Sequence, residues 1–374
     1  FLRACKEAGH AYTHDLNGAQ QEGFGPMPMT VAQGKRSSAS RSYLRPVKDR
    51  RNLQVLTQAQ VQRIEMRGNQ AICVEVMLKG QIERLTAAKE ILLCAGAINS
   101  PQLLMLSGIG PGAQLQSMGL ETIVDSPQVG RNLMDHLEVY VQQACTKSVS
   151  LHKHLGLLGR AKIGVQWLTT YKGLGATNHF EVGGFVRSDP SQAQPDIQFH
   201  FLPTAMSYDG SAKAEGHGFQ VHVGPMLPKS RGAVTLRSSR PNEAPRIVFN
   251  YMSHEDDWLV FRSAIRQARE IFSQPALAHL RGLELSPGRQ CQSDAELDAF
   301  VAAHAESAYH PCGTCRMGSD AQAVVDPEGR VNGVIGLRVI DASVFPHITN
   351  GNLNAPTIML AERLADLIRG QLSQ

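Results

Sequence analysis

The 374-residue sequence predicts an α/β domain combined with an α+β domain that has a mostly antiparallel sheet. The first observation is the stretch EILLCAGAINSPQLLMLSGIG at residues 90–110, which has the pattern of a buried strand, a turn of small residues and a helix. The second is residues 195–252, where short apolar runs are separated by turn residues. With 42% hydrophobic and 19% charged residues, the chain has an ordinary globular composition and enough length for two domains.

The first half of the chain is expected to be rich in strands. Within 90–110, Ile91–Cys94 form the buried strand, Ser100–Pro101 begin a short helix and Gly108 ends it. Three further strands are expected where apolar and polar residues alternate, at 51–65, 71–78 and 83–89.

The second half is expected to contain helices as well as strands. A capping box formed by Ser293 and Glu296 begins one helix, which runs to about Tyr309. Apolar periodicity predicts a helix at 255–272, a buried strand at 337–343 and a final helix at 356–369.

The charge and the cysteine content exclude several classes of protein. A net charge of +4 is too small to indicate a nucleic-acid partner, and the basic segment at 34–51 is better explained as a solvated helix face than as a phosphate-binding patch, because aromatic residues are nearly absent there. Seven widely spaced cysteines do not form a disulfide framework and indicate an intracellular, reducing compartment. No apolar run approaches the roughly 20 residues of a membrane span, and no signal peptide is visible.

The stretch SAYHPCGTCRMG at 307–318 is the first candidate for chemistry. A zinc site would combine His310 with Cys312 and Cys315, but no second Cys-x-x-Cys or histidine pair lies at a suitable spacing. A redox dithiol is expected at a helix start after a strand, whereas this pair follows a predicted helix. We therefore expect no metal site, and His310 is either a structural histidine or a catalytic base.

A second candidate is the region around the last predicted strand and helix. Asp341 ends the strand, where carboxylates commonly bind a ribose or cap a helix, and Asn354 is placed to be the N-cap of the final helix. The free N–H groups of such a helix start attract an anion. No Gly-x-Gly-x-x-Gly follows a predicted strand, since the nearest match, at 108–112, ends a helix instead of beginning one.

Together these stretches resemble the glucose–methanol–choline (GMC) family of FAD-dependent alcohol oxidoreductases. GAINSPQLLMLSGIG at 96–110 fits the second signature of that family, and VGRNLMDH, HPCGTCRMG, VIDASVFP and GNLNAPTIM follow in its order and spacing. The resemblance covers essentially the whole chain, and NHFEVGGF and FNYMSHEDDW are most similar to choline-oxidising members. The family's opening βαβ unit, which carries Gly-x-Gly-x-x-Gly, is absent. The chain, which begins at Phe1, therefore looks like a C-terminal fragment that lacks the first βαβ of an FAD-binding domain, and we expect it to bind FAD poorly.

The resemblance implies FAD as the cofactor and gives two residues the chemistry. His310 matches the family's general base near the flavin, and Asn354 matches its partner, which hydrogen-bonds the same substrate oxygen. Segments 1–150 and 306–374 would form the FAD-binding domain, and 151–305 the substrate-binding domain. The residues expected beside FAD are Val61, Ala95, Gly96, Ala97, Asp341, Ala342, Asn352, Ala355 and Thr357.

The resemblance also implies choline as the substrate, oxidised to betaine aldehyde on the way to glycine betaine. A permanent cation is bound by a carboxylate and aromatic faces, and Glu181 and Tyr309 are the candidates for these roles. Phe199 and Phe201 are further candidates, unless the alternation of side chains along their strand directs them into the core. The alternative for Glu181 is a surface glutamate that does not bind substrate.

Other properties stay open at the level of sequence. The electron acceptor is oxygen, a quinone of a respiratory chain or a carrier protein, and membrane association at a bacterial inner membrane or in a mitochondrion would follow the family's dehydrogenases. The competing functions are oxidation of another alcohol by the same kind of site, and an inactive truncated product that is no enzyme. The sequence does not distinguish these.

Overall fold

The computed structural model describes residues 1–206 and 216–370, and these form two compact units. Unit 1 comprises Phe1–Val55, Leu137–Met226 and Asp256–Glu306, whereas unit 2 comprises Leu56–His136, Leu227–Glu255 and Ser307–Gln374. Residues 207–215, which fall within the region predicted as antiparallel strands, lie outside the described residues. This division differs from the expected segments 1–150, 151–305 and 306–374. Residues 1–55 belong to unit 1 whereas 56–136 belong to unit 2, and residues 227–255, which were expected in the second segment, also belong to unit 2.

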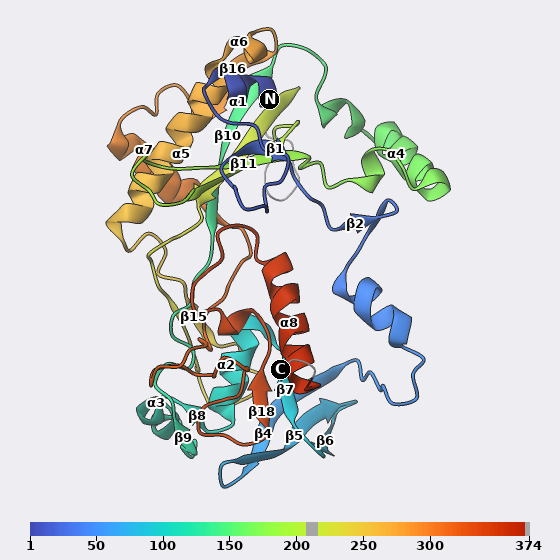
Figure 1. Cartoon of the computed structure of the whole chain (residues 1–374), viewed down its shortest axis with the longest axis vertical. Helices are drawn as coiled ribbons and strands as arrows, with labels where there is room; N and C mark the ends of the chain where they lie inside the picture. Colours follow the sequence, from blue (N-terminus) through green and yellow to red (C-terminus); the bar gives the residue numbers. More distant parts are fainter. Residues whose placement is uncertain (207–215, 371–374) are drawn as a thin grey trace. The chain divides into compact units, whose positions relative to one another are not determined.

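Unit 1 is built on an antiparallel sheet (Figure 1). Its main path follows the order β1 (Gly23–Pro26), β11 (Val182–Val186), β12 (Ile197–Leu202), β13 (Gly218–Pro225), β10 (Leu137–Cys145) and β16 (Arg281–Ser286), and β17 (Glu306–Ser307) also pairs with β10. All neighbours along the path are antiparallel, which confirms the predicted sheet type. Pairing of β1 with β11, with Gly23 opposite Phe185, holds the N-terminal stretch in this unit.

Two helices of unit 1 match their sequence signals closely. α5 (Glu255–Ser273) buries an apolar stripe that includes Phe261, Ile265 and Phe272, as its periodicity predicts. α7 (Asp294–His304) begins with the predicted capping box but ends at His304, before the expected end near Tyr309, because the next residues form β17. The two helices lie side by side (Figure 1), and Arg262 of α5 donates to Asp298 of α7 at 2.7 Å.

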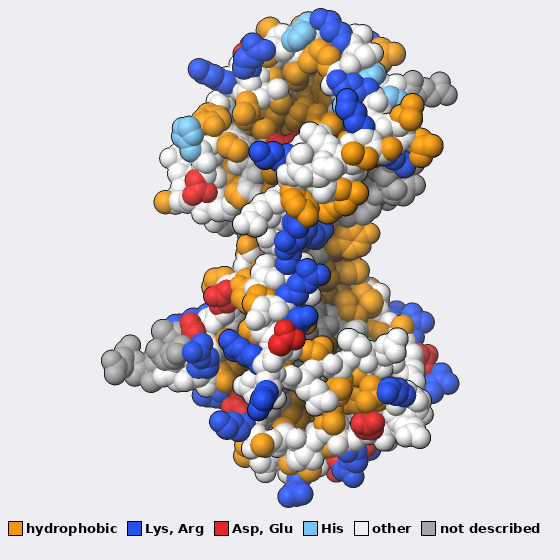
Figure 2. All heavy atoms as spheres, turned by 90° about the vertical axis from the view of Figure 1, so that its right-hand side faces the viewer, with side chains coloured by type: hydrophobic (Ala, Val, Ile, Leu, Met, Phe, Trp, Pro, Cys, Tyr) orange, Lys and Arg blue, Asp and Glu red, His pale blue; other side chains and the backbone are white. Residues whose placement is uncertain are grey.

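The basic segment lies on the surface of unit 1. No residue of its two short helices is buried, as expected for a solvated face. Figure 2 shows Lys and Arg side chains in blue along the side of the molecule that carries this segment. The remaining elements of the unit are α1 (Leu2–Glu7), β2 (Val31–Ala32), β3 (Lys35–Arg36), η1 (Ser40–Leu44), η2 (Arg45–Val47), η3 (Leu151–His154), α4 (Leu157–Thr170), η4 (Leu174–Ala176) and α6 (Pro275–Ala278).

Unit 2 contains several small sheets instead of one large one. The three strands predicted before residue 90 form an antiparallel sheet of β4 (Ala59–Arg67), β5 (Gln70–Leu78) and β6 (Gln81–Thr86). The other pairs are β7 (Ile91–Leu93) with β18 (Leu337–Val339), β8 (Ile109–Gly110) with β9 (Val124–Asp125), and β14 (Ala233–Thr235) with β15 (Arg246–Val248). The expectation of a single sheet over 195–252 is therefore wrong, since β12 and β13 belong to unit 1 and β14 and β15 to unit 2.

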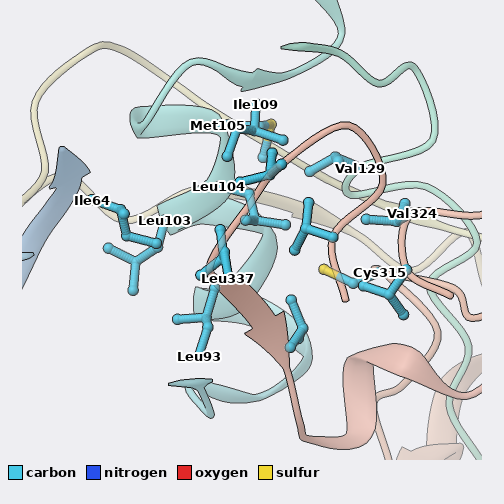
Figure 3. Packing of buried hydrophobic residues seen from close by; sticks show 14 of the residues in the cluster. Ile64, Leu93, Leu103, Leu104, Met105, Ile109, Val129, Cys315, Val324 and Leu337 are labelled. Atoms are coloured by element: carbon cyan, nitrogen blue, oxygen red, sulfur yellow. The ribbon is translucent and has the colours of Figure 1, made fainter. Parts of the chain in front are cut away.

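The core of unit 2 surrounds α2 (Gly96–Leu106). Figure 3 shows Leu103, Leu104 and Met105 of this helix packed with Ile109 and with Leu337 of β18. Burial of eight of the eleven helix residues explains why this segment is apolar on nearly every side. The other helices of the unit are α3 (Gly112–Ser117), η5 (Ala342–Val344) and α8 (Asn354–Ile368).

Two of the predicted helix starts are wrong by a few residues. α2 begins at Gly96, ahead of the expected Ser100–Pro101, and α8 begins at Asn354, ahead of Pro356. In the first case Ser100 lies inside the first turn of α2, and its hydroxyl accepts a hydrogen bond from the N–H of the N-cap residue Ala95 at 3.0 Å. Among the described helices, none combines the length and the apolar character that crossing a membrane requires.

Candidate active site

One carboxylate joins the segments that follow the parallel strands β7 and β18. Asp341 comes directly after β18 and is 8% exposed. Its Oδ2 accepts hydrogen bonds from the N–H of Gly96 at 2.9 Å and from the hydroxyl of Ser100 at 2.5 Å, while its Oδ1 accepts from the N–H of Ser343 at 2.8 Å. The start of α2 is thereby fixed against η5.

The small-residue turn at this edge has room for a ligand. Gly96 has a φ of +82°, and no atom lies within 4 Å of the position that a Cβ would occupy there. Carboxyl ends of parallel strands together with a helix start are where open α/β sheets bind dinucleotides. At the start of α8, Asn352 and Ala355 are also exposed. The residues present therefore fit a nucleotide cofactor such as FAD, which the turn at Ala95–Ala97, η5 and the start of α8 would hold.

The segment that carries His310 is fixed on both sides within unit 2. The backbone N–H and C=O groups of Met134 and Cys312 exchange two hydrogen bonds, at 3.0 and 2.9 Å. The hydroxyl of Thr314 donates to the carbonyl of Ala97 at 2.6 Å, on the turn described above. His310 is therefore anchored to the same scaffold that would hold the cofactor.

The two cysteines of this segment are packing residues. Cys312 and Cys315 are both 0% exposed and lie in the apolar clusters of unit 2. Burial raises the pKa of the Cys312 thiol to about 12 and also raises the pKa of Cys315, so neither forms a thiolate at neutral pH. All seven cysteines are free thiols, and within the described ranges no three His, Cys, Asp or Glu side chains are arranged to hold a metal ion.

His310 lies on a loop and is half-buried. Its Nδ1 is 2.9 Å from Nδ1 of His136, and the two rings are nearly perpendicular, with an interplanar angle of 86°. Its Nε2 is 3.5 Å from the amide Nδ2 of Asn352. The ring thus has one nitrogen directed to a buried histidine and the other toward the exposed start of α8.

Asp135 organises the surroundings of this pair. The carboxylate is 4% exposed, and its Oδ1 accepts from the backbone N–H of His136 at 2.9 Å and of His310 at 2.8 Å. Its Oδ2 accepts from the hydroxyls of Tyr251 and Ser307, each at 2.6 Å. Burial and the hydrogen bond to Asp135 raise the pKa of Tyr251, so its hydroxyl remains a donor. Four donors on one buried carboxylate give this loop a single arrangement.

Sequence reasoning missed these neighbours of His310. It included Asp135 and His136 in the VGRNLMDH stretch, and Tyr251 in FNYMSHEDDW, but gave none of them a role. The sequence contained a weak signal, because Asp135 and His136 directly precede the largely buried strand β10. Polar side chains that are buried beside such a strand need hydrogen-bond partners. The signal does not identify those partners, which lie more than one hundred positions away along the chain.

The prediction that Asn354 caps the last helix is wrong. The N-cap of α8 is Leu353, and Asn354 is its first helical residue, with an exposed side chain that makes no capping bond. The amide that faces the ring of His310 is that of Asn352. Tyr309 is 67% exposed and has a φ of +59°, so its ring is directed away from the core. Its role as a substrate wall stays a prediction.

The other residues expected beside the cofactor have varied positions in unit 2. Val61 lies in β4, where it packs against the large apolar cluster. Ala342 is the half-buried first residue of η5. The hydroxyl of Thr357 donates to the carbonyl of Leu353 at 2.8 Å, which is a bond inside the helix start. Contact of these residues with FAD stays a prediction.

The remaining substrate candidates belong to unit 1. Glu181 is exposed, and its carboxylate accepts a hydrogen bond from the hydroxyl of Thr177 at 2.6 Å. Phe199 is 0% exposed and meets Phe24 edge-on, with ring centroids 5.3 Å apart. Phe201 stacks on Phe1 at 4.4 Å. The two phenylalanines therefore lie in an aromatic cluster of unit 1, which favours the core alternative for both.

The family follows from comparison with known proteins. Family models described as GMC oxidoreductase match residues 1–138 and 228–361. Chains of this family are FAD-dependent oxidoreductases that act on the CH–OH groups of their donors. The chain belongs to the GMC oxidoreductase family.

Bacterial choline dehydrogenases are similar to this chain over almost its whole length. The chain is 53% identical to an oxygen-dependent choline dehydrogenase of Brucella anthropi over 99% of its own length and 68% of the relative's, and 54% identical to one of Ectopseudomonas mendocina, which it covers to 66%. Among solved structures, it is similar to a pyridoxine 4-oxidase from Mesorbium loti, with a TM-score of 0.86 and 32% identity over 99% of this chain and 69% of that one. A formate oxidase from Aspergillus oryzae has a TM-score of 0.92 and 27% identity over 99% and 70%.

Proposed function

We propose that this chain is the greater part of an enzyme that oxidises choline to betaine aldehyde with FAD. The observation that carries the proposal is the position of His310, whose Nε2 is directed toward the exposed start of α8 while its backbone is fixed by a buried carboxylate. The choline dehydrogenases with 52–54% identity over nearly the whole chain support choline over other alcohols. The chain's coverage of 68% of such a relative supports the view that it is a fragment.

In the proposed reaction, the Nε2 of His310 takes the proton of the substrate hydroxyl. FAD, when bound, would supply the hydride acceptor: the hydroxyl oxygen would lose H⁺, the carbon that bears it would lose H⁻, and the alcohol would become an aldehyde. The amides of Asn352 and Asn354, both exposed at the start of α8, would donate hydrogen bonds to the substrate oxygen. Asp135 keeps the histidine backbone in place during the transfer.

The cofactor would be held by residues of unit 2. The turn at Ala95, Gly96 and Ala97, the η5 segment with Asp341 and Ala342, and the start of α8 form the proposed site. Val61 would meet the adenine through its backbone. A segment with Gly-x-Gly-x-x-Gly is absent from this chain, and we propose that FAD binds weakly without it.

The trimethylammonium group of choline would be recognised by Glu181 together with Tyr309. The exposure of Glu181 supports access to a ligand, and its carboxylate accepts a hydrogen bond from the neutral hydroxyl of Thr177. Oxygen is the electron acceptor that the names of the relatives support.

The test uses the chain extended by its natural upstream coding sequence. Anaerobic mixing with choline should bleach the flavin absorbance, and the His310→Ala variant should slow this by a factor of about 10² to 10⁴, the usual contribution of a general base. His279→Ala, an exposed histidine of unit 1, is the matched control and should reduce the flavin at the wild-type rate. Flavin reduction by His310→Ala within a few-fold of wild type would place the base elsewhere.

Two competing functions give different outcomes in the same assay. For oxidation of an uncharged alcohol, Glu181→Gln would leave the preference between choline and that alcohol unchanged, whereas recognition of choline by Glu181 predicts a large loss for choline alone. For a product that is no enzyme, the chain as it stands would contain no flavin and the extended form would not be reduced by any alcohol. A yellow chain without the upstream segment would contradict the proposed weak binding of FAD.

A further inference from the structure

The contact between His136 and His310 limits where their protons can be. Two ring nitrogens 2.9 Å apart require one hydrogen between them, since two would clash and none would leave two lone pairs in contact. With both rings neutral, either His310 donates from Nδ1 and leaves its Nε2 unprotonated, or His136 donates and forces the proton of His310 onto Nε2. Only the first arrangement allows His310 to accept a proton at Nε2.

The surroundings favour the first arrangement. The amide Nδ2 of Asn352 lies 3.5 Å from Nε2 of His310, and an amide N–H₂ group faces a lone pair and not another N–H. His136 is 0% exposed, whereas His310 is half-buried with its Nε2 directed toward the exposed start of α8. Of the two rings, that of His310 is therefore the one placed to meet a substrate, and the arrangement that leaves its Nε2 unprotonated makes His136 the acceptor.

We infer that His136 is a positioning residue that fixes the tautomer of His310 by accepting its Nδ1–H. This inference rests on the proposed function, in which His310 removes the hydroxyl proton. A carboxylate has this role in the Ser-His-Asp triad, and here a neutral imidazole replaces it. When His310 becomes an imidazolium, it keeps the same Nδ1–H···Nδ1 bond, so proton transfer at Nε2 needs no rearrangement of the pair.

Asp135 gives the pair its fixed distance. The same Oδ1 accepts the backbone N–H groups of both histidines, at 2.9 and 2.8 Å, so the two backbones are tied to one atom. The carbonyl of His136 also accepts the N–H of Ala308 at 2.9 Å, two residues before His310. The two backbones therefore cannot separate without breaking buried hydrogen bonds, which is costly, and this keeps the two rings within reach of each other.

The experiment reads the tautomer directly. In the chain labelled with ¹⁵N-histidine, long-range ¹H–¹⁵N correlation spectra distinguish protonated from unprotonated ring nitrogens, and His310→Gln identifies the signals of His310. At a pH high enough for the imidazole ring to be neutral, wild-type His310 should be protonated at Nδ1 and unprotonated at Nε2. His136→Leu removes the acceptor and should move the proton to Nε2, the position that a free histidine side chain prefers. His136→Asn, whose Oδ1 can accept at the same place, should restore the wild-type pattern.

The outcomes separate this inference from the proposed function. Wild-type His310 with its proton on Nε2, or the same tautomer in wild type and His136→Leu, would overturn the inference whatever the activity of the enzyme. If the leucine variant does not fold, the wild-type tautomer and the asparagine variant alone decide. In the extended enzyme, flavin reduction should be slow in His136→Leu and largely recovered in His136→Asn. If the tautomer is as inferred but His310→Ala still reduces the flavin rapidly, the proposed function fails and the positioning by His136 stands.

Discussion

Loss of the Asp341 carboxylate should loosen unit 2 at the edge where the cofactor is expected. Its two oxygens accept three hydrogen bonds, from Gly96, Ser100 and Ser343, and the residue is 8% exposed. A hydrogen bond to a charged group contributes about 1.5–3 kcal/mol, and three bonds on one group do not add fully. We therefore expect Asp341→Ala to lower the free energy of unfolding of unit 2 by about 4 kcal/mol.

Asp341→Asn gives a smaller and more specific change. The asparagine oxygen can still accept from Gly96 and Ser100, while its NH₂ group then faces the N–H of Ser343 and one bond is lost. The expected decrease in the free energy of unfolding is about 2 kcal/mol. Glu83→Gln, which removes an exposed carboxylate from β6 of the same unit, is the matched control and should stay within about 0.5 kcal/mol of wild type.

The assay must distinguish the two units. Both tryptophans, Trp167 and Trp258, belong to unit 1, so fluorescence in urea follows that unit alone. Pulsed hydrogen exchange with mass spectrometry on peptides from 90–106 and 337–345 follows unit 2. The reasoning is refuted if these peptides unfold at the same urea concentration in Asp341→Ala as in Glu83→Gln.

Three further predictions concern other parts of the chain. Buried Cys312 and Cys315 should react with iodoacetamide at pH 8 only after unfolding, as peptide mass spectrometry would detect, and rapid labelling of the native chain would contradict their burial. Arg338 lowers the pKa of Glu90, so the stability that the pair contributes is present above the unfolded pKa of 4.5 and is lost as the pH falls through the folded value. The Glu90→Gln variant should therefore unfold at a lower urea concentration than wild type at pH 7, and it should lose less stability on acidification. If the urea midpoints of the variant and of wild type changed equally between pH 7 and pH 3, the pair would not contribute this stability. Ser293→Ala removes one half of the capping box of α7 and should cost about 1 kcal/mol, measured by tryptophan fluorescence in urea, whereas Ser293→Thr should cost little.

Elements with strong local signals were predictable from the sequence. α5 has an apolar stripe at helical period, α7 has a capping box, and the strands β4, β5 and β6 alternate and are joined by short turns. In each case the deciding interaction lies within a few residues or between neighbouring strands. The family was also readable, because its motifs are contiguous stretches of sequence.

Features that depend on distant partners were not predictable. α2 begins earlier than its proline suggests because Asp341, 245 positions away, accepts the N–H of Gly96. The cap of the last helix was assigned to Asn354 because local rules favour asparagine, yet Leu353 occupies that place. The stretch 1–55 could not be assigned to unit 1 from composition, since the pairing of β1 with β11 decides it.

The partition of the candidate residues between the two units has a consequence for mechanism. His310, His136, Asp135, Asn352 and Asn354 all belong to unit 2, so the groups proposed to move the proton are assembled by one unit. Glu181, the proposed partner of the substrate cation, belongs to unit 1. Changes in Glu181 should therefore alter KM and the preference among alcohols while the tautomer of His310 is unchanged. Changes in His136 should alter kcat and the tautomer together. A Glu181→Gln variant that shifted the ¹⁵N signals of His310 in the free enzyme would show that recognition and proton transfer are not separable in this way.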